Sequence, residues 1–187
     1  MAMPAPIAMP RYTIDDLESF PDDGNRYELL DGMLLVSPAP LPSHELVVQR
    51  IHYELVSYLG KRARVFGRAA VQLRPRTSLE PDLLVLPASV KLRRVWADIT
   101  GWWLAVEVSG RGSRIYDRDF KHAAYPRLGV QEAWRVDLAE RCIDVVREPG
   151  GAVARLKDQL LWQPAGMAEP LRINLPEVFQ DVEDDWF

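Results

Sequence analysis

The chain has 187 residues, of which 48% are hydrophobic and 27% are charged, and its formal net charge is −4. This composition is typical of a globular domain with a buried core and excludes a disordered or collagen-like chain. The single cysteine, Cys142, allows no internal disulfide, and no apolar run approaches the roughly 20 residues of a membrane span. We expect one cytoplasmic domain over residues 11–187, preceded by a flexible lead of residues 1–10 that lacks the features of a signal peptide.

Basic residues gather in three clusters, although acids outnumber bases in the whole chain. The clusters are Lys61, Arg62, Arg64, Arg68, Arg74 and Arg76; Lys91, Arg93 and Arg94; and Arg111, Arg114 and Arg118. Such clusters favour phosphate binding, but solvated arginines at a helix end and along a strand give the same pattern without a ligand. We take the following residues as candidate nucleic-acid contacts: Arg62, Arg64, Arg68, Arg111 and Arg114.

The first strong structural signal is a β-hairpin over Arg26–Val36. Asp31-Gly32 is a type I′ turn sequence, and apolar residues flank it on both sides. Glu28 is unusual in the first strand, because strands disfavour glutamate unless it is exposed or has a function. The hairpin therefore presents one acid as a candidate functional residue.

A long amphipathic helix is predicted next. Ser43 is expected to cap a helix that runs to about Arg62, because apolar residues recur there at spacings of three and four. His44 falls in its first turn, where it can contact a phosphate or an attacking water, or serve only as a polar residue at the helix start. A strand is predicted over Val65–Leu73.

Two short apolar runs each contain a single acid. Asp82 precedes Leu83–Leu86, and Glu107 lies near the end of the run Trp102–Val108. A continuous apolar run of this length is typical of a buried strand. The helix predicted after them, over Tyr116–Leu128, contains Lys121.

The rest of the chain predicts more strands and one short helix. Ala133–Val136 and Cys142–Val146 read as paired strands, Val153–Trp162 and Leu171–Leu175 as edge strands, and Pro176 as the start of a terminal helix. With the earlier elements this predicts an α/β fold in which helices flank a central mixed sheet.

Asp82, Glu107 and Lys121 provide the smallest set of side chains, two carboxylates and one amine, that magnesium-assisted cleavage of a phosphodiester needs. The reaction needs a metal, a positioned water and a cation where charge develops, and magnesium accepts one or two carboxylates while keeping several waters. If the two strands are neighbours, both acids can meet at one edge of the sheet, and Glu28 can add a ligand or a base. The alternative is that the acids sit at strand ends, facing water or an arginine, and that Lys121 is a surface residue paired with Asp117.

The ordered set of motifs resembles the Uma-type restriction endonuclease family of the PD-(D/E)XK nuclease superfamily. The resemblance spans about Arg11 to Phe179. It rests on Arg26-Tyr27-Glu28-Leu29-Leu30-Asp31-Gly32, Ser37-Pro38-Ala39-Pro40, His44, Pro81-Asp82-Leu83-Leu84-Val85, Val106-Glu107-Val108, Asp117, Lys121, Tyr125, Gly129-Val130-Gln131-Glu132-Ala133-Trp134 and Val136-Asp137.

The resemblance implies a restriction-endonuclease-like fold in which Asp82, Glu107 and the backbone carbonyl of Val108 bind Mg2+ or Mn2+. In the usual pattern of the superfamily the catalytic lysine lies two residues after the second acid, but that position is Ser109 here. Related families place the lysine on the following helix, which Lys121 matches. The loop that follows Glu107 also departs from the family pattern, which leaves the local substrate contacts open.

The leading hypothesis is a magnesium-dependent endonuclease that hydrolyses DNA, with Asp82, Glu107, Lys121 and Glu28 in the site and His44 as a further nucleic-acid contact. We expect a homodimer, because two symmetric sites suit the cutting of both strands of a duplex. The first alternative is a catalytically inactive module that keeps the nuclease fold and binds nucleic acid or a protein. The second is a structural or regulatory dimer in which these charges form a buried ion-pair network.

Overall fold

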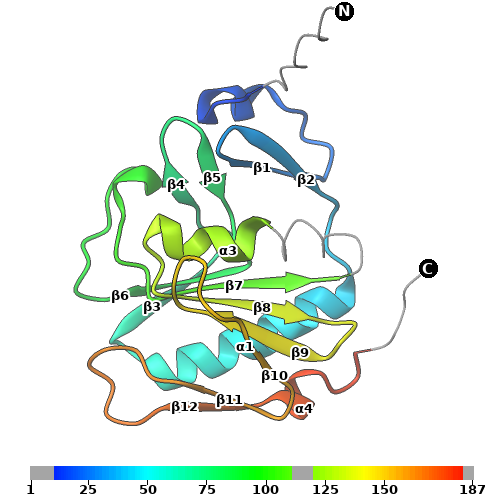
Figure 1. The fold of residues 1–187 in the computed structure, drawn as a ribbon, viewed down its shortest axis with the longest axis vertical. Helices are drawn as coiled ribbons and strands as arrows, with labels where there is room; N and C mark the ends of the chain where they lie inside the picture. Colours follow the sequence, from blue (N-terminus) through cyan, green and yellow to red (C-terminus); the bar gives the residue numbers. More distant parts are fainter. Residues whose placement is uncertain (1–10, 111–119, 183–187) are drawn as a thin grey trace, which may run out of the picture.

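The computed structural model describes residues 11–110 and 120–182, and a mixed β-sheet lies at its centre (Figure 1). Within the described residues six strands form this sheet, in the order β10-β9-β8-β7-β6-β3. They are β3 (Ala63–Gly67), β6 (Leu83–Pro87), β7 (Leu104–Ser109), β8 (Glu132–Asp137), β9 (Cys142–Val146) and β10 (Ala154–Leu156). The β7–β8 pair is parallel and the others are antiparallel, so the expected central mixed sheet is confirmed.

Two smaller sheets complete the described strands. One has the order β2-β1-β5-β4 and the other pairs β11 with β12. Their bounds are β1 (Arg26–Leu30), β2 (Met33–Ser37), β4 (Val71–Leu73), β5 (Thr77–Leu79), β11 (Gln159–Trp162) and β12 (Leu171–Asn174). The predicted hairpin is β1–β2, and Asp31 and Gly32 have φ of 53° and 86°, as a type I′ turn requires.

The described helical segments are η1 (Ile14–Ser19), α1 (Pro42–Leu59), η2 (Trp96–Asp98), α3 (His122–Ala124), η4 (Tyr125–Leu128) and α4 (Leu175–Val178). Helices cover both faces of the central sheet, whereas η1 lies beside β1 of a smaller sheet (Figure 1). The stripe of α1 that contains Val47, Ile51 and Leu55 is buried against one face, while α3 and η4 cover the other (Figure 1). No helix within residues 11–110 and 120–182 has the length and apolar character needed to cross a bilayer.

Alternate residues of the central strands point to opposite faces of the sheet and pack into two separate apolar cores. Leu83 and Val106 pack into the core that α1 covers, whereas Leu84 and Ala105 pack into the core that contains Tyr125. This alternation follows from the two-residue period of a strand. It also fixes the face on which any neighbouring polar residue must lie.

Two predicted strands are wrong because turns divide them. The predicted strand Val65–Leu73 is β3 and β4, which belong to different sheets; Arg68 between them has a left-handed φ of 57° that turns the chain. The predicted strand Val153–Trp162 is likewise β10 and β11, again in different sheets. Short apolar stretches predict strands well but do not show where a turn redirects them.

Helix boundaries also differ from the sequence prediction. Helix α1 begins at Pro42 rather than after a Ser43 cap, because proline suits the first position of a helix, where the missing N–H has no partner to lose. Of the helix predicted over Tyr116–Leu128, residues 116–119 lie outside the described residues, as does the predicted N-terminal lead. The remainder ends in the 3-10 turn η4 at Gly129, whose φ is 84°.

Candidate active site

Asp82 and Glu107 lie at the end of the β6–β7 ladder. Its last pair is Leu83 with Val106; Asp82 precedes Leu83, Glu107 follows Val106, and the Val108 N–H donates to Asp82 Oδ2 at 2.8 Å. Leu83 and Val106 pack into the core that α1 covers, whereas Glu107 contacts Tyr125 on the α3 side and Asp82 contacts His44 of α1. Both are buried, with 6% and 3% exposure. The structure thus brings together the two carboxylates that lie 25 positions apart in the sequence.

Asp82 is held by three partners. Its Oδ1 accepts hydrogen bonds from Arg26 Nη1 and Nη2 at 3.2 and 3.1 Å, and its Oδ2 lies 3.1 Å from His44 Nε2 and accepts from Val108 N–H at 2.8 Å. Burial alone would raise the pKa of Asp82, but the hydrogen bonds and positive charge of His44 and Arg26 outweigh it and lower that pKa. Burial opposes protonation of His44, but contact with Asp82 prevails and raises the pKa of His44.

Lys121 lies between Glu107 and Glu28 of the β1–β2 hairpin. Its ammonium group contacts Glu28 Oε2 and lies 3.6 Å from Glu107 Oε1. The Tyr125 hydroxyl donates a hydrogen bond to the same Glu107 oxygen at 2.5 Å, and Glu28 Oε1 accepts a hydrogen bond from the Glu80 N–H at 2.7 Å. Lys121 is only 1% exposed, so it is not the surface residue that the alternative interpretation predicts.

Local geometry explains why these side chains converge. Arg26 and Glu28 are two positions apart in β1 and therefore share one face of that strand. Lys121 and Tyr125 are four positions apart across α3 and η4, so both point the same way from that helical segment. His44 comes from the first turn of α1.

The charges around the site nearly balance. Glu28, Asp82 and Glu107 supply three buried carboxylates. Arg26 and Lys121 are cations that contact them, and His44, whose pKa is raised, contacts Asp82 as a third basic group. Glu80, which neighbours Glu28, has a raised pKa, first because of burial and second because of the Glu28 charge. With His44 protonated, the three carboxylates and the three basic groups balance.

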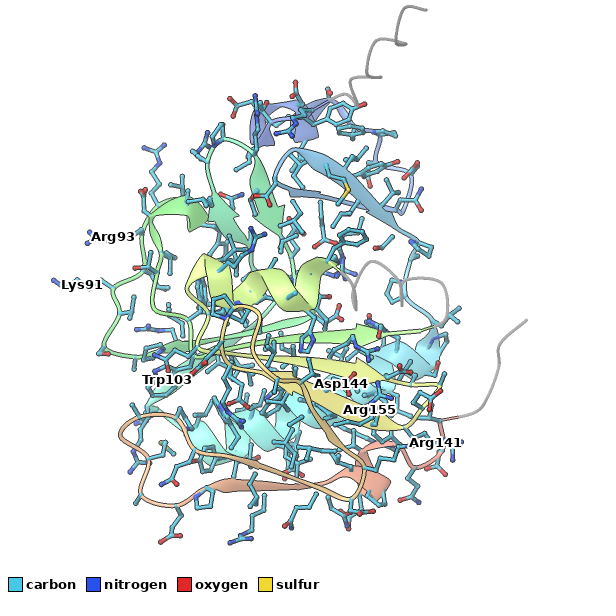
Figure 2. The ribbon with its side chains drawn as sticks, viewed as in Figure 1. Lys91, Arg93, Trp103, Arg141, Asp144 and Arg155 are labelled. Atoms are coloured by element: carbon cyan, nitrogen blue, oxygen red, sulfur yellow. The ribbon has the colours of Figure 1, made fainter. Side chains whose placement is uncertain are left out.

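A charged ladder continues from Glu107 across the sheet. The strand registers pair Glu107 with Arg135, Arg135 with Asp144, and Asp144 with Arg155, all on the α3 face. Arg135 is fully buried and also donates to Asp137 at 2.9 Å, whereas Arg155 lies at the open edge beside Asp144 (Figure 2). A row of charged residues at matching positions of β7, β8, β9 and β10 therefore extends from Glu107 to the outer strand, with ion pairs from Arg135 to Asp144 and from Asp144 to Arg155.

The oxygen donors at the site fit a small divalent cation. In an antiparallel ladder a residue directs its N–H and C=O to the same neighbouring strand, so the carbonyl of Val108 faces the side on which its N–H meets Asp82. Asp82, Glu107 and this carbonyl are the kind of donors that magnesium prefers. Over residues 11–110 and 120–182, no three His, Cys, Asp or Glu side chains group closely enough to hold a metal by themselves, so water would complete the shell.

The candidate nucleic-acid contacts are spread over different places. Arg62 and Arg64 lie at the Pro87 end of β3, away from Asp82, and Arg64 donates to the carbonyls of Ala88 and Val90 at 3.3 and 3.1 Å. Arg64 thus holds the loop after β6.

Arg68 and His44 lie close to Asp82, Arg68 because it follows the end of β3 that pairs with Leu83. Arg111 and Arg114 lie outside the described residues. In the second basic cluster, Lys91 and Arg93 project outward from the loop after β6 (Figure 2).

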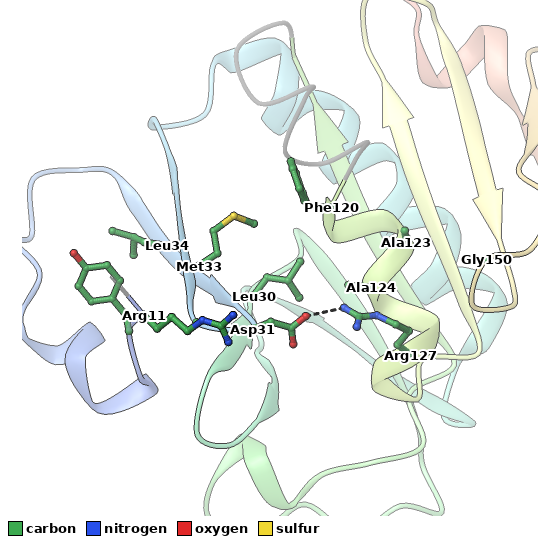
Figure 3. A pocket seen from close by; sticks show the side chains of 12 residues that line it. Arg11, Leu30, Asp31, Met33, Leu34, Phe120, Ala123, Ala124, Arg127 and Gly150 are labelled. Atoms are coloured by element: carbon green, nitrogen blue, oxygen red, sulfur yellow. Dashed lines mark hydrogen bonds and ion pairs between the residues drawn. The ribbon is translucent and has the colours of Figure 1, made fainter. Parts of the chain in front are cut away.

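Two cavities of similar size flank the cluster. One, of about 710 Å3, opens at Asp82 between α1 and the end of β3. The other, also about 710 Å3, is mostly apolar and lies between the β1–β2 turn and the α3–η4 segment, where Arg127 pairs with Asp31 at 3.1 Å (Figure 3). Only the first contains a residue of the charged cluster in its polar end, so we place the candidate site there.

Sequence reasoning assigned no role to Arg26, Tyr125 and Arg135. The i, i+2 spacing of Arg26 and Glu28 in a strand, and the i, i+4 spacing of Lys121 and Tyr125 in a helix, were the available signals for the first two. Arg135 had no such signal, because its partners come from other strands.

Comparison with known proteins identifies a family that matches this sequence and a solved structure with a similar fold. The Uma2 family, described as "Putative restriction endonuclease", matches residues 14–183. A crystal structure from Anabaena variabilis ATCC 29413, described as "a putative nuclease belonging to DUF820", superposes with a TM-score of 0.77 and covers 92% of this chain and 99% of that chain at 17% identity. No curated protein matches the chain. The expected α/β fold class is confirmed.

Proposed function

This chain belongs to the Uma2 family, and we propose from that membership and from the geometry of its site that it is a metal-dependent endonuclease that hydrolyses DNA phosphodiester bonds. The observation that carries the proposal is the pair of buried carboxylates at the end of the β6–β7 ladder, Asp82 and Glu107, with the buried ammonium group of Lys121 at 3.6 Å from Glu107. Two acids and an amine converge although they come from three separate elements.

Asp82, Glu107 and the Val108 carbonyl would hold Mg2+ or Mn2+. When bound, the metal supplies positive charge to the phosphate oxygens and lowers the pKa of a coordinated water. His44 and, to a smaller extent, Arg26 lower the pKa of Asp82, and the Tyr125 hydroxyl fixes the orientation of Glu107 through the hydrogen bond at 2.5 Å. These partners prepare both carboxylates as anionic oxygen donors.

Lys121 and His44 are placed to act on the substrate. The Lys121 ammonium group, on a flexible stem, can turn from Glu28 to donate a proton in a hydrogen bond to the attacking water or to a phosphate oxygen. Glu28 then serves as the acceptor that holds Lys121 in the cluster before substrate binds. His44, whose Nε2 contacts Asp82 at 3.1 Å, would when protonated place a positive charge beside a phosphate bound at Asp82.

Replacement of Asp82 tests the proposal. Asp82→Asn keeps the size of the side chain but removes its charge, so we expect loss of Mn2+ binding, measured by calorimetry, and at least a 100-fold loss of plasmid cleavage, in the range of a removed electrostatic contact. Asp181→Asn is the matched control, because Asp181 is an acid with 72% side-chain exposure that pairs with Arg50 far from the site. Wild-type cleavage by D82N would end the proposal.

A catalytically inactive module is the second candidate, and one observation favours it. Both oxygens of Asp82 already have protein partners, so the charges can also be a self-sufficient network. In that case Mn2+ does not bind and D82N behaves like D181N toward DNA. The homodimer expected from the symmetry of duplex cleavage stays a prediction, to be checked by sedimentation.

A further inference from the structure

A groove leads away from Asp82 along the first half of α1. Its cavity has a volume of about 710 Å3, in the range of ligand sites, and Asp82 and Arg26 form its polar end. One wall is α1 and the other is the end of β3 with Gly67 and Arg68. Any polymer whose backbone lies at Asp82 has this groove as an adjacent path.

The α1 wall of the groove combines the apolar residues Pro42, Leu46 and Val48 with one polar stripe. Glu45, Gln49 and His52 recur at intervals of four and three, so they form one stripe of the helix, distinct from the buried stripe that faces the sheet. Glu45 is paired with His44 at 3.6 Å. The other polar groups of this stripe are the side-chain amide of Gln49 and the imidazole of His52.

Arg68 forms the opposite wall in an unfavourable backbone conformation. Its φ of 57° is left-handed, a region that non-glycine residues rarely adopt and that is concentrated at functional positions. The preceding residue, Gly67, lies beside Asp82: a Cβ there would be in ordinary van der Waals contact with the backbone oxygen of Asp82, at 3.8 Å. Arg68 is exposed and is one of the residues that line the groove ending at Asp82.

We propose that this groove binds the nucleotide next to the scissile phosphate, with Arg68 on its phosphate and Gln49 and His52 on its sugar or base edge. The inference rests on the proposed nuclease function. Arginine is well suited to a phosphate and glutamine to an adenine edge. No tryptophan, tyrosine or phenylalanine is among the described residues that line the groove, so recognition relies on polar contacts rather than on the aromatic stacking of many single-strand binders.

Arg68→Gly tests the groove without loss of the fold. Glycine adopts a positive φ without strain, so the melting temperature should stay equal or rise. Binding of a fluorescein-labelled DNA duplex and of the single strand, measured by anisotropy in EDTA, should weaken about 5- to 10-fold for whichever form the protein binds, and the salt slope should fall by about 1. Gln49→Ala should weaken binding less and leave the salt slope unchanged.

Arg172→Ala is the matched control, since Arg172 is an exposed arginine on β12, in another sheet, with no role in the candidate site. It should change affinity less than twofold. Equal effects of R68G and R172A, or no DNA binding by the wild type, would contradict the proposed role of the groove. Failure of the nuclease proposal looks different: plasmid stays uncut and Mn2+ does not bind, yet R68G alone still weakens DNA binding, which supports the groove as a nucleic-acid site.

Discussion

Lys121→Met separates a catalytic role of the lysine from a structural one. At 3.6 Å and an effective dielectric constant of about 20, the attraction between Lys121 and Glu107 is about 5 kcal/mol before desolvation is counted. Removing one partner from a buried pair costs about 3–5 kcal/mol, because the acids Glu28 and Glu107 are left without compensation. For a domain of this size that corresponds to a fall in melting temperature of roughly 6–20 °C.

The double variant K121M/E28Q removes the excess negative charge and keeps a hydrogen-bond acceptor for the Glu80 N–H. We expect it to recover at least half of the lost stability, measured by urea unfolding, while DNA cleavage stays abolished. Arg127→Met is the control, because the Arg127–Asp31 pair is half exposed and should contribute at most about 1 kcal/mol. Recovery of cleavage together with stability would refute a catalytic role for Lys121.

Two further variants address the partners of the acids. Tyr125→Phe removes the hydroxyl that donates to Glu107 and should destabilise the protein by about 1.5–3 kcal/mol in urea unfolding; a loss below about 0.5 kcal/mol would contradict the importance of this bond. The pKa of His44 is raised above its ordinary 6.5, so its charged contact with Asp82 adds stability fully below that pH and loses it as the pH rises through the folded-state pKa. His44→Gln, compared with wild type in metal-free buffer, should therefore cost more free energy of unfolding at about pH 5.5 than at about pH 8.5, and equal costs would contradict the assignment.

The strands that carry the acids could be predicted because local composition determines them. Each apolar run with one acid became a strand beside that acid, and the Asp31-Gly32 turn formed where its sequence indicated. From the sequence, the meeting of Asp82 and Glu107 could be predicted only on the condition that their two strands are neighbours. Strand order and register depend on the whole fold, and a shift of one residue would have turned every side chain of a strand to its other face.

The basic clusters show where sequence reasoning reached its limit. Arg62, Arg64 and Arg68 lie within seven residues, which suggested one nucleic-acid surface. In a strand, however, that stretch spans about 20 Å, so its two ends face different parts of the molecule. Arg64 binds loop carbonyls and Arg68 reaches the groove, a division that depends on the position of β6 rather than on the arginines themselves.

The row of charged residues on β7, β8 and β9 follows from the way alternate strand residues point to opposite faces of the central sheet. The α1 face of the central strands is continuous hydrocarbon and can supply the stabilisation of the core, which leaves the α3 face able to hold Glu107, Arg135 and Asp144. Buried charges add little net stability even when paired, so a row of them is weak evidence for a purely structural purpose. The partners of Asp82 and Asp144 lower the pKa of both carboxyls, and Asp82 lies at the groove, where an ionised carboxylate can contribute to cation binding. The cost of burying charge is thus concentrated where the proposed chemistry would use it.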